Sequence, residues 1–144
     1  MAPVIYQSIS KWDEKKRPYI YPATVETENN DHIIVEVGPG RGDFLFHLAM
    51  QNPQALVIGI EIKAKRIDKL IDRSQKRGIK NLQLIEADAR HILKSSLLKS
   101  KTEAIHINFP DPWPKKRHAK HRVMNKNFIQ NCIDALEDNG HLYF

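Results

Sequence analysis

The feature that most constrains the fold is a regular alternation of short apolar runs with amphipathic segments. Runs of seven or eight residues, such as "HIIVEVG" and "ALVIGIEI", recur along the chain. Continuous apolar runs of this length are typical of strands that are buried on both faces of a sheet. The predicted strands cover residues 32–38, 55–62, 81–88 and 103–109, and a fifth begins at 141–144.

Helical periodicity follows each of these runs. The predicted helices cover residues 43–51, 63–77, 89–98 and 128–136. The side chains expected to face the core are Phe44, Leu45, Leu48, Ala49, Ile67, Leu70, Ile71, Phe128, Ile129, Cys132, Ile133 and Leu136. Gly78 and the Asn139-Gly140 pair are expected to end the second and fourth helices. This alternation predicts βαβ units with right-handed crossovers, and therefore a doubly wound, mostly parallel α/β sheet.

Length and composition fit one domain. The chain has 144 residues, of which 41% are hydrophobic, and this is enough for a core. Residues 1–31 lack a clear period and are interpreted as an arm or lead-in, so the folded domain is expected at 32–144. The single cysteine, Cys132, excludes an intramolecular disulfide and fits a reducing compartment. No run approaches the length of a membrane span and no signal peptide is recognised, so we expect a cytoplasmic protein.

The positive charge is concentrated in one segment. The formal net charge is +6, but five bases and no acid lie between residues 115 and 122, which leaves only +1 for the rest of the chain. Such a patch favours a polyanionic partner such as nucleic acid, and a solvated positive face is the alternative. The bases, which would contact a phosphate backbone, are Lys115, Lys116, Arg117, Lys120 and Arg122.

A glycine-rich loop follows the first predicted strand. Its spacing, G-x-G-x-G at Gly38, Gly40 and Gly42, differs from the dinucleotide fingerprint G-x-G-x-x-G. Glu36 precedes the loop and Asp43 begins the next helix, so negative charge lies where a pyrophosphate would need a free helix N-terminus. The loop is therefore predicted to suit a cation rather than an anion.

Acids also lie at the ends of the second and third predicted strands. Doubly wound sheets bind ligands beyond the carboxyl ends of their strands, so Glu36, Glu61 and Asp88 are expected at one site. S-adenosylmethionine suits this set, because Glu36 can stabilise its positive end, Glu61 can accept the ribose hydroxyls and Asp88 can accept the adenine amine. The glycines would let the backbone approach the methionine part closely. The alternative is that each acid only caps a helix or faces solvent.

The segment "FPDPWPKKRHAKHR", residues 109–122, follows the fourth predicted strand. Prolines on both sides of Asp111 restrict the backbone and remove donors, which would hold the carboxylate beside the methyl donor. Phe109 or Trp113 offers a face on which a base can stack, and a carboxylate matches the paired donors on the edge of guanine. The alternative places Trp113 in the core and leaves the basic side chains of this segment exposed to solvent. The predicted substrate contacts are Trp113, Lys115, Lys116 and Arg117.

Together these pieces resemble the tRNA (guanine-N(7)-)-methyltransferase family. The resemblance covers roughly residues 33–144 and rests on "EVGPGRGDFL", "IGIEI", "NLQLIEADA" and "FPDPWPKKRHAKHR", in the family's order. It implies a Rossmann-like class I methyltransferase fold in which the three acids at the strand ends contact S-adenosylmethionine. By the same resemblance, Asp111 is important for catalysis and Lys115 contacts the tRNA substrate.

The implied reaction asks little of the protein's side chains. Ring nitrogen 7 of guanine has a free lone pair, so direct in-line attack on the sulfonium methyl group is sufficient and alignment dominates. Asp111 could stabilise the positive charge that develops on the base. The two histidines of "RHAKHR" have no acid nearby, so no metal site is predicted.

The sequence departs from the family at its end. The family continues past the fifth strand, with a further acid and a T-x-F-E motif on the substrate side, whereas this chain stops at Phe144. The chain is therefore interpreted as truncated in its C-terminal part. An apolar edge at residues 141–144 would invite pairing with another copy, so a homo-oligomer is also among the expectations.

Two other functions stay open on the residues alone. The "DPW" after the fourth strand is similar to the D-P-P-[WFY] motif of enzymes that methylate exocyclic amines of adenine or cytosine. The chain could instead be a basic RNA-binding fragment that has no catalytic activity.

Overall fold

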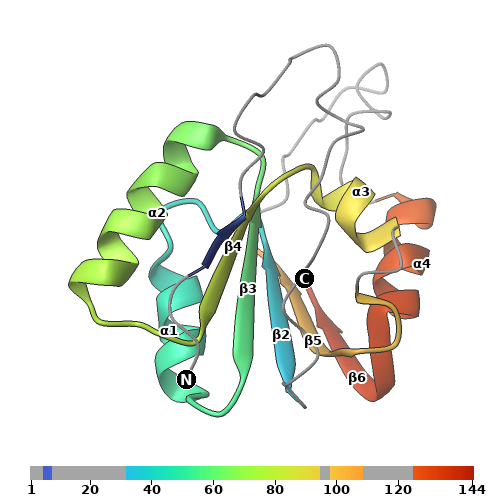
Figure 1. Cartoon of the computed structure of the whole chain (residues 1–144). Coiled ribbons are helices and arrows are strands. Elements are labelled where there is room, and N and C mark those ends of the chain that lie inside the picture. The colour runs from blue at the N-terminus through green and yellow to red at the C-terminus, as the bar shows by residue number, and fades with distance from the viewer. Residues whose placement is uncertain (1–4, 8–31, 95–97, 109–124) are drawn as a thin grey trace.

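The computed structural model describes residues 5–7, 32–94, 98–108 and 125–144. Within this part of the chain, six strands form one sheet in the order β1-β4-β3-β2-β5-β6, and all neighbours pair in parallel (Figure 1). The strands are β1 (Ile5–Gln7), β2 (Ile33–Val37), β3 (Leu56–Glu61), β4 (Leu82–Glu86), β5 (Thr102–Ile107) and β6 (Leu136–Tyr143). The helices are α1 (Asp43–Gln51), α2 (Ala64–Lys76), α3 (Ala89–Lys94) and α4 (Lys126–Ala135). The predicted doubly wound parallel sheet is confirmed.

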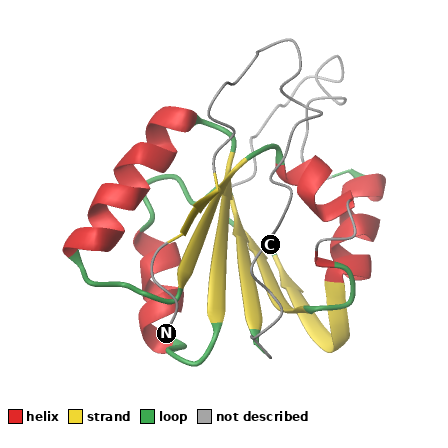
Figure 2. Ribbon diagram, in the orientation of Figure 1, coloured by secondary structure: helices red, strands yellow, loops and turns green. Residues whose placement is uncertain are grey.

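Helices cover both faces of this sheet (Figure 2). Helices α1 and α2 pack on one face, and α3 and α4 pack on the other. Side chains of β2 alternate between these layers, so that Val35 joins the core under α3 and α4 while Ile34 joins the core under α1 and α2. Strands β2, β3 and β4 are buried along their whole length, which explains why they read as continuous apolar runs.

Two side chains predicted for the core lie at the surface instead. Phe44 of α1 is 37% exposed and Ile133 of α4 is 51% exposed, whereas Phe46 is completely buried. Helix α1 packs against both β3 and α2, and this turns its buried arc toward Phe46, whose ring lies 4.8 Å from the guanidinium of Arg77. The ring of Phe44 meets His106 of β5 edge-on, with 5.1 Å between the ring centroids.

The junction between α4 and β6 also differs from the prediction. Helix α4 ends at Ala135, and Leu136 already pairs with Thr102 of β5. The Asn139-Gly140 pair therefore lies inside β6, at a register shift between two paired stretches, and does not end a helix. The open edge of β5 is the physical reason, because its backbone groups need partners. A Cβ on Gly140 would lie 3.0 Å from the carbonyl oxygen of Thr102, so glycine suits this irregularity.

The region interpreted as an arm contributes one short strand. Residues Ile5–Gln7 pair in parallel with Gln83–Ile85 and so extend the sheet beyond β4. The rest of residues 1–31 lies outside the described part of the chain. The predicted strands of the central sheet agree with the observed ones to within two residues at each end. Gly78 ends α2 as expected, and its N–H donates to the carbonyl of Gln75.

Asn81 joins the loops at the amino-terminal edge of β3 and β4. Its buried side-chain amide donates to the carbonyl oxygens of Ala49, Asn52 and Ala55, at 2.9, 3.0 and 3.1 Å. Replacing Asn81 with leucine is expected to lower the free energy of unfolding by about 2 kcal/mol, because buried carbonyls lose their donor. Urea denaturation measures this change. The control Gln54→Leu removes an exposed amide and should stay within about 0.5 kcal/mol; an equal loss in both variants would contradict the assignment.

Candidate ligand site at the carboxyl ends of the strands

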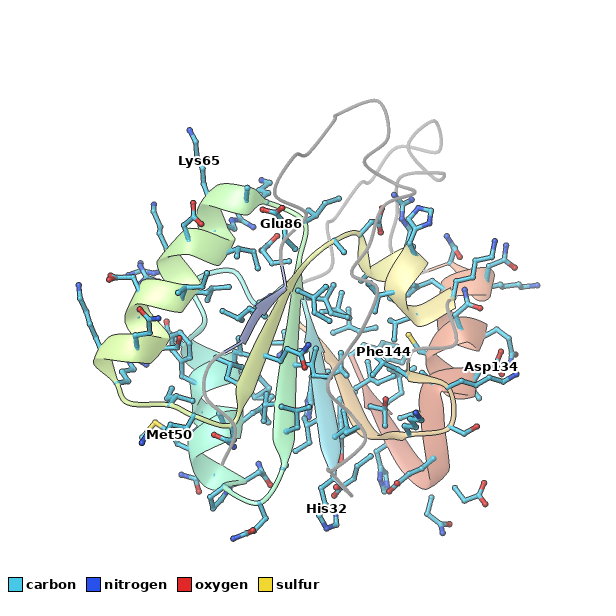
Figure 3. All side chains as sticks on the ribbon, in the orientation of Figure 1. His32, Met50, Lys65, Glu86, Asp134 and Phe144 are labelled. Carbon is cyan, nitrogen blue, oxygen red and sulfur yellow. The ribbon has the colours of Figure 1, made fainter. Side chains whose placement is uncertain are left out.

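The three acids predicted from the sequence lie at one edge of the sheet. Glu36 is the next-to-last residue of β2, Glu61 ends β3, and Asp88 lies two residues beyond β4. Because the strands are parallel, these positions share the carboxyl-terminal edge. Figure 3 marks this edge by Glu86, the last residue of β4, at the opposite end of the sheet from His32.

Glu36 is buried and has few hydrogen-bond partners. The residue is only 2% exposed, and its Oε2 accepts one hydrogen bond, from Asn108 Nδ2 at 3.0 Å. Its Oε1 is buried and has no hydrogen-bond partner among the described residues. Burial raises the pKa of Glu36 to about 7, and the hydrogen bond from Asn108 lowers it only in part. A buried carboxylate with one unsatisfied oxygen is suited to a cationic ligand.

Glu61 is buried but has nearby basic groups. Its Oε2 accepts a hydrogen bond from the backbone N–H of Lys63 at 3.0 Å. The half-exposed guanidinium of Arg66 lies 3.5 Å from Oε1, which makes an ion pair but no hydrogen bond, so this oxygen retains its acceptor capacity. A free acceptor next to a bound one is an arrangement that can take up a hydroxyl donor.

Asp88 has a structural role at this edge. Its Oδ1 accepts from the backbone N–H of Arg90 at 2.9 Å, and the Arg90 guanidinium grips both carboxylate oxygens at 2.6 to 3.1 Å. Burial by itself raises the pKa of Asp88, but the hydrogen bonds and positive charge of Arg90 outweigh it and hold this pKa below its ordinary value. Asp88 therefore caps the start of α3 and stays ionised.

The three glycines of the loop differ in their surroundings. Gly38, Gly40 and Gly42 all have positive φ, between 58° and 91°, where other residues are strained. A Cβ on Gly38 or Gly40 would meet no atom of the described protein within 4 Å, so these glycines leave open space. A Cβ on Gly42 would run into Leu70 and Phe46. Packing of α1 on α2 thus accounts for Gly42, whereas the open space at Gly38 and Gly40 can admit a ligand.

Two polar residues of this edge are absent from the sequence prediction. Glu86 is buried and pairs in register with Glu61, so both side chains project from the same face of the sheet. The available signal was its position two residues after the core residue Leu84, on the same face of β4, but the sequence prediction placed the acid of this strand at Asp88. Asn108 directly follows β5, and its only sequence signal is that it is a polar residue at the end of an apolar run.

The other predicted site residues lie outside the described part of the chain. They are the predicted catalytic residue Asp111 and the predicted substrate contacts Trp113, Lys115, Lys116 and Arg117. Among the residues that are described, no group of three or more histidine, cysteine, aspartate or glutamate side chains has the geometry of a metal site. In the same part of the chain, no helix has the length and apolar character needed to cross a membrane.

The charge of the edge is unevenly compensated. Arg66 and Arg90 face the carboxylates of Glu61 and Asp88, whereas within the described part of the chain the only hydrogen-bond donor to Glu36 is a neutral amide. When Glu36 is ionised, its negative charge therefore has no positive partner among the described residues, just before the glycine loop. This arrangement suits a ligand that has a cationic end for Glu36 and hydroxyl or amine donors for the outer acids.

Comparisons with known proteins agree with this architecture. Residues 30–144 match the protein family described as "Putative methyltransferase". A tRNA (guanine-N(7)-)-methyltransferase of Syntrophotalea carbinolica is 35% identical over 116 residues, which cover 81% of this chain and 50% of that protein. A protein of the same name from Bacillus cytotoxicus is 40% identical over 120 residues, which cover 83% of this chain and 55% of the other. The chain thus spans about half the length of the curated relatives it matches.

A solved structure supports the fold independently. The crystal structure of a SAM dependent methyltransferase from Aquifex aeolicus matches with a TM-score of 0.57 and 16% identity, over 75% of this chain and 52% of that one. At this identity the likeness establishes the fold alone, which is that of the class I methyltransferases. The parallel sheet with its acidic carboxyl edge and the match over residues 30–144 lead to one conclusion. The chain belongs to the family described as "Putative methyltransferase".

Proposed function

We propose that this chain is the methyl-donor-binding part of a tRNA (guanine-N(7)-)-methyltransferase, which transfers a methyl group from S-adenosylmethionine to ring nitrogen 7 of a guanine in tRNA. One observation carries the proposal: relatives of that name are 35 to 40% identical over 110 residues or more. The acidic edge of the sheet supports the same class of reaction, because it is suited to a cationic methyl donor.

The residues of this edge fit S-adenosylmethionine. Glu36 offers a buried oxygen with no hydrogen-bond donor for the positive end of the methionine part. Gly38 and Gly40 leave room for its close approach. Glu61 would accept the ribose hydroxyls through its free oxygen, and Asp88 would accept the adenine amine. Bound S-adenosylmethionine supplies a methyl group that is activated by a sulfonium, so the protein's task is alignment.

The substrate side of the proposal rests on the motif "FPDPWPKKRHAKHR". We assign Asp111 to the edge of the guanine, where its carboxylate would stabilise the positive charge left by methylation of a ring nitrogen. Trp113 would stack on the base, and Lys115, Lys116 and Arg117 would contact phosphates. A guanine held in line with the methyl group needs no general base, because the attacking lone pair carries no proton.

Analysis of the methylated nucleoside tests this function. The chain is incubated with tRNA and S-adenosylmethionine, and the RNA is digested with nuclease and analysed by mass spectrometry. We expect N7-methylguanosine. A methyl group on an exocyclic amine of adenine or cytosine would instead favour the amino-methyltransferase alternative.

Calorimetry separates the proposal from the non-catalytic alternative. Titration with S-adenosylmethionine should give a saturable heat, because Glu36, Gly38 and Gly40 are part of this chain. Absence of any heat at millimolar donor, together with retained tRNA binding, would favour an RNA-binding fragment without catalytic activity.

Loss of two lysines is expected to weaken tRNA binding in a salt-dependent way. Each basic side chain that contacts a phosphate releases a counterion. The double variant Lys115→Ala, Lys116→Ala should therefore make the slope of log affinity against log salt concentration shallower by about 2. Fluorescence anisotropy with labelled tRNA between 50 and 200 mM salt measures it. Lys99→Ala with Lys101→Ala removes the same charge from exposed positions before β5 and should leave the slope unchanged. Equal slopes for the two pairs would contradict the assignment.

Two further properties complete the proposal. We infer that the enzyme acts in the cytoplasm, where its single thiol stays reduced. Burial raises the pKa of Cys132 to about 12, which keeps the thiol protonated.

Self-association through β6, which has one neighbouring strand in the described sheet, is a prediction that light scattering tests.

A further inference from the structure

We propose that Asn108 is a positioning residue, which holds the carboxylate of Glu36 so that its second oxygen faces the cationic end of the methyl donor. This inference rests on the proposed function for the identity of the donor. It adds a residue that acts through Glu36. Asn108 directly precedes the motif that begins at residue 109, and its side chain bonds to Glu36, which precedes the glycine loop.

The geometry follows from the pairing of β2 with β5. Glu36 pairs in register with His106, so Asn108 lies two residues further along on the same face of the sheet, just beyond β5. From there its Nδ2 donates to Glu36 Oε2 at 3.0 Å. The other oxygen, Oε1, is buried, since Glu36 is only 2% exposed, and it receives no hydrogen bond among the described residues. One oxygen is fixed and the other is left for a ligand.

A neutral donor is the right chemistry for this task. A lysine or arginine at position 108 would orient the carboxylate equally well, but its charge would neutralise Glu36 and compete with a cationic ligand. The amide of Asn108 orients the carboxylate through one hydrogen bond and leaves its negative charge uncompensated. Glu61 and Asp88 show the contrast, because each has an arginine beside it.

Other titratable groups near Glu36 do not replace Asn108. The neighbouring strands contribute Glu61 from β3 and His106 from β5, and α1 contributes Asp43 at its start and His47 at its middle. None of these four makes a hydrogen bond or ion pair with Glu36 among the described residues. Burial lowers the pKa of His106, so its ring is neutral near pH 7 and supplies no positive charge.

The arrangement couples donor binding to a proton. Burial raises the pKa of Glu36 to about 7, so much of the free protein carries a protonated carboxyl at neutral pH. A bound cation favours the ionised form and lowers this pKa, so binding releases a proton. Affinity should therefore rise with pH by roughly eightfold between pH 6 and 7.5 and then level off. The donor's own α-amino group has an ordinary pKa of about 7.7 to 8.0, so most of the donor keeps its positive charge up to pH 7.5.

The experiment compares Asn108→Leu with the wild-type chain by two measurements. NMR titration of the Glu36 side-chain carboxyl follows its pKa in the ligand-free protein, and calorimetry follows affinity for S-adenosylmethionine between pH 6 and 7.5. We expect the Glu36 midpoint to move upward in Asn108→Leu and the affinity at pH 7 to fall roughly fivefold or more. Asn108→Gln, which keeps the amide donor, should recover part of both. Asn127→Leu makes the same change on the exposed face of α4 and should alter neither.

The outcomes are distinct. Support requires an upward Glu36 midpoint in Asn108→Leu and no further loss of affinity when Asn108→Leu is added to Glu36→Gln, since the two act through one carboxylate. An unchanged midpoint in Asn108→Leu overturns the inference, as does a loss of affinity that is the same at every pH. If the midpoint moves while wild-type protein fails to bind S-adenosylmethionine, the positioning of Glu36 stands and the proposed function fails.

Discussion

Under the proposed function, replacing Asp111 with alanine is expected to reduce the rate of methyl transfer to tRNA at least a hundredfold. The reason is electrostatic: methylation of a ring nitrogen leaves a positive charge on the guanine, and a fixed carboxylate beside it stabilises the transition state more than the ground state. Removal of a single group that stabilises developing charge typically costs about 10² to 10³ in rate. The rate is measured as transfer of labelled methyl from S-adenosylmethionine under single-turnover conditions, so that product release does not limit it.

The fold and the donor site should survive this change. Binding of S-adenosylmethionine to Asp111→Ala is expected to stay within about threefold of wild type, because the donor is assigned to other carboxylates. Asp134→Ala is the matched control: Asp134 lies on the exposed side of α4, where its Oδ1 accepts a hydrogen bond from Gln130 Nε2 at 2.9 Å. It should transfer methyl at the wild-type rate. A wild-type rate for Asp111→Ala would remove that residue from the mechanism.

Gly42→Ala is expected to destabilise the fold by about 3 kcal/mol. Gly42 forms the N-cap of α1 with φ of 91°, a conformation that costs a residue with a Cβ about 1 to 2 kcal/mol. The new methyl group would also overlap Leu70 Cδ2 and lie 2.8 Å from the ring of Phe46, and overpacking of this kind costs about 1 to 3 kcal/mol. The two costs add because the strain is in the backbone and the overlap is between side chains.

Gly40→Ala separates these two costs. Gly40 also has positive φ, at 58°, but a Cβ there would meet no atom of the described residues within 4 Å. Its loss of stability should therefore be about 1 kcal/mol, from backbone strain alone. Chemical denaturation of both variants gives the comparison. Equal losses at Gly40 and Gly42 would mean that packing of α1 on α2 does not depend on the missing side chain.

Most strands and helices could be predicted from the sequence, because burial and helical period leave a pattern in neighbouring residues. Strands such as β3 are buried on both faces, so their residues are apolar without interruption, and helix α2 repeats its apolar positions at the helical period. The same reasoning succeeded for Gly78, whose positive φ is a property of a single residue at a helix end. It failed for Asn139-Gly140, which has the chemistry of a helix stop but serves a bulge in β6.

Helix faces show the limit of periodicity. Phe44 and Phe46 are both apolar and only two residues apart, and the sequence pattern favoured Phe44 for the core. The structure buries Phe46 because α2 lies on that side of α1, and the position of a neighbouring helix is not encoded in the periodicity of α1 itself. Ile133 of α4 is a second case, since half of its surface is exposed although it recurs at the helical period.

The candidate site divides along the same line. An acid at or just past the end of each of three buried strands, and a glycine-rich loop after the first of them, can be predicted from the sequence because strand ends and turns are local features. Which of these groups meet depends on the tertiary structure. Glu36 and Asn108 are 72 residues apart, and Glu61 and Glu86 are neighbours on one face of the sheet only because β3 and β4 pair in that register. Strand order and register arise from packing of the whole sheet, and this is why one acid is left with a neutral partner and a free oxygen.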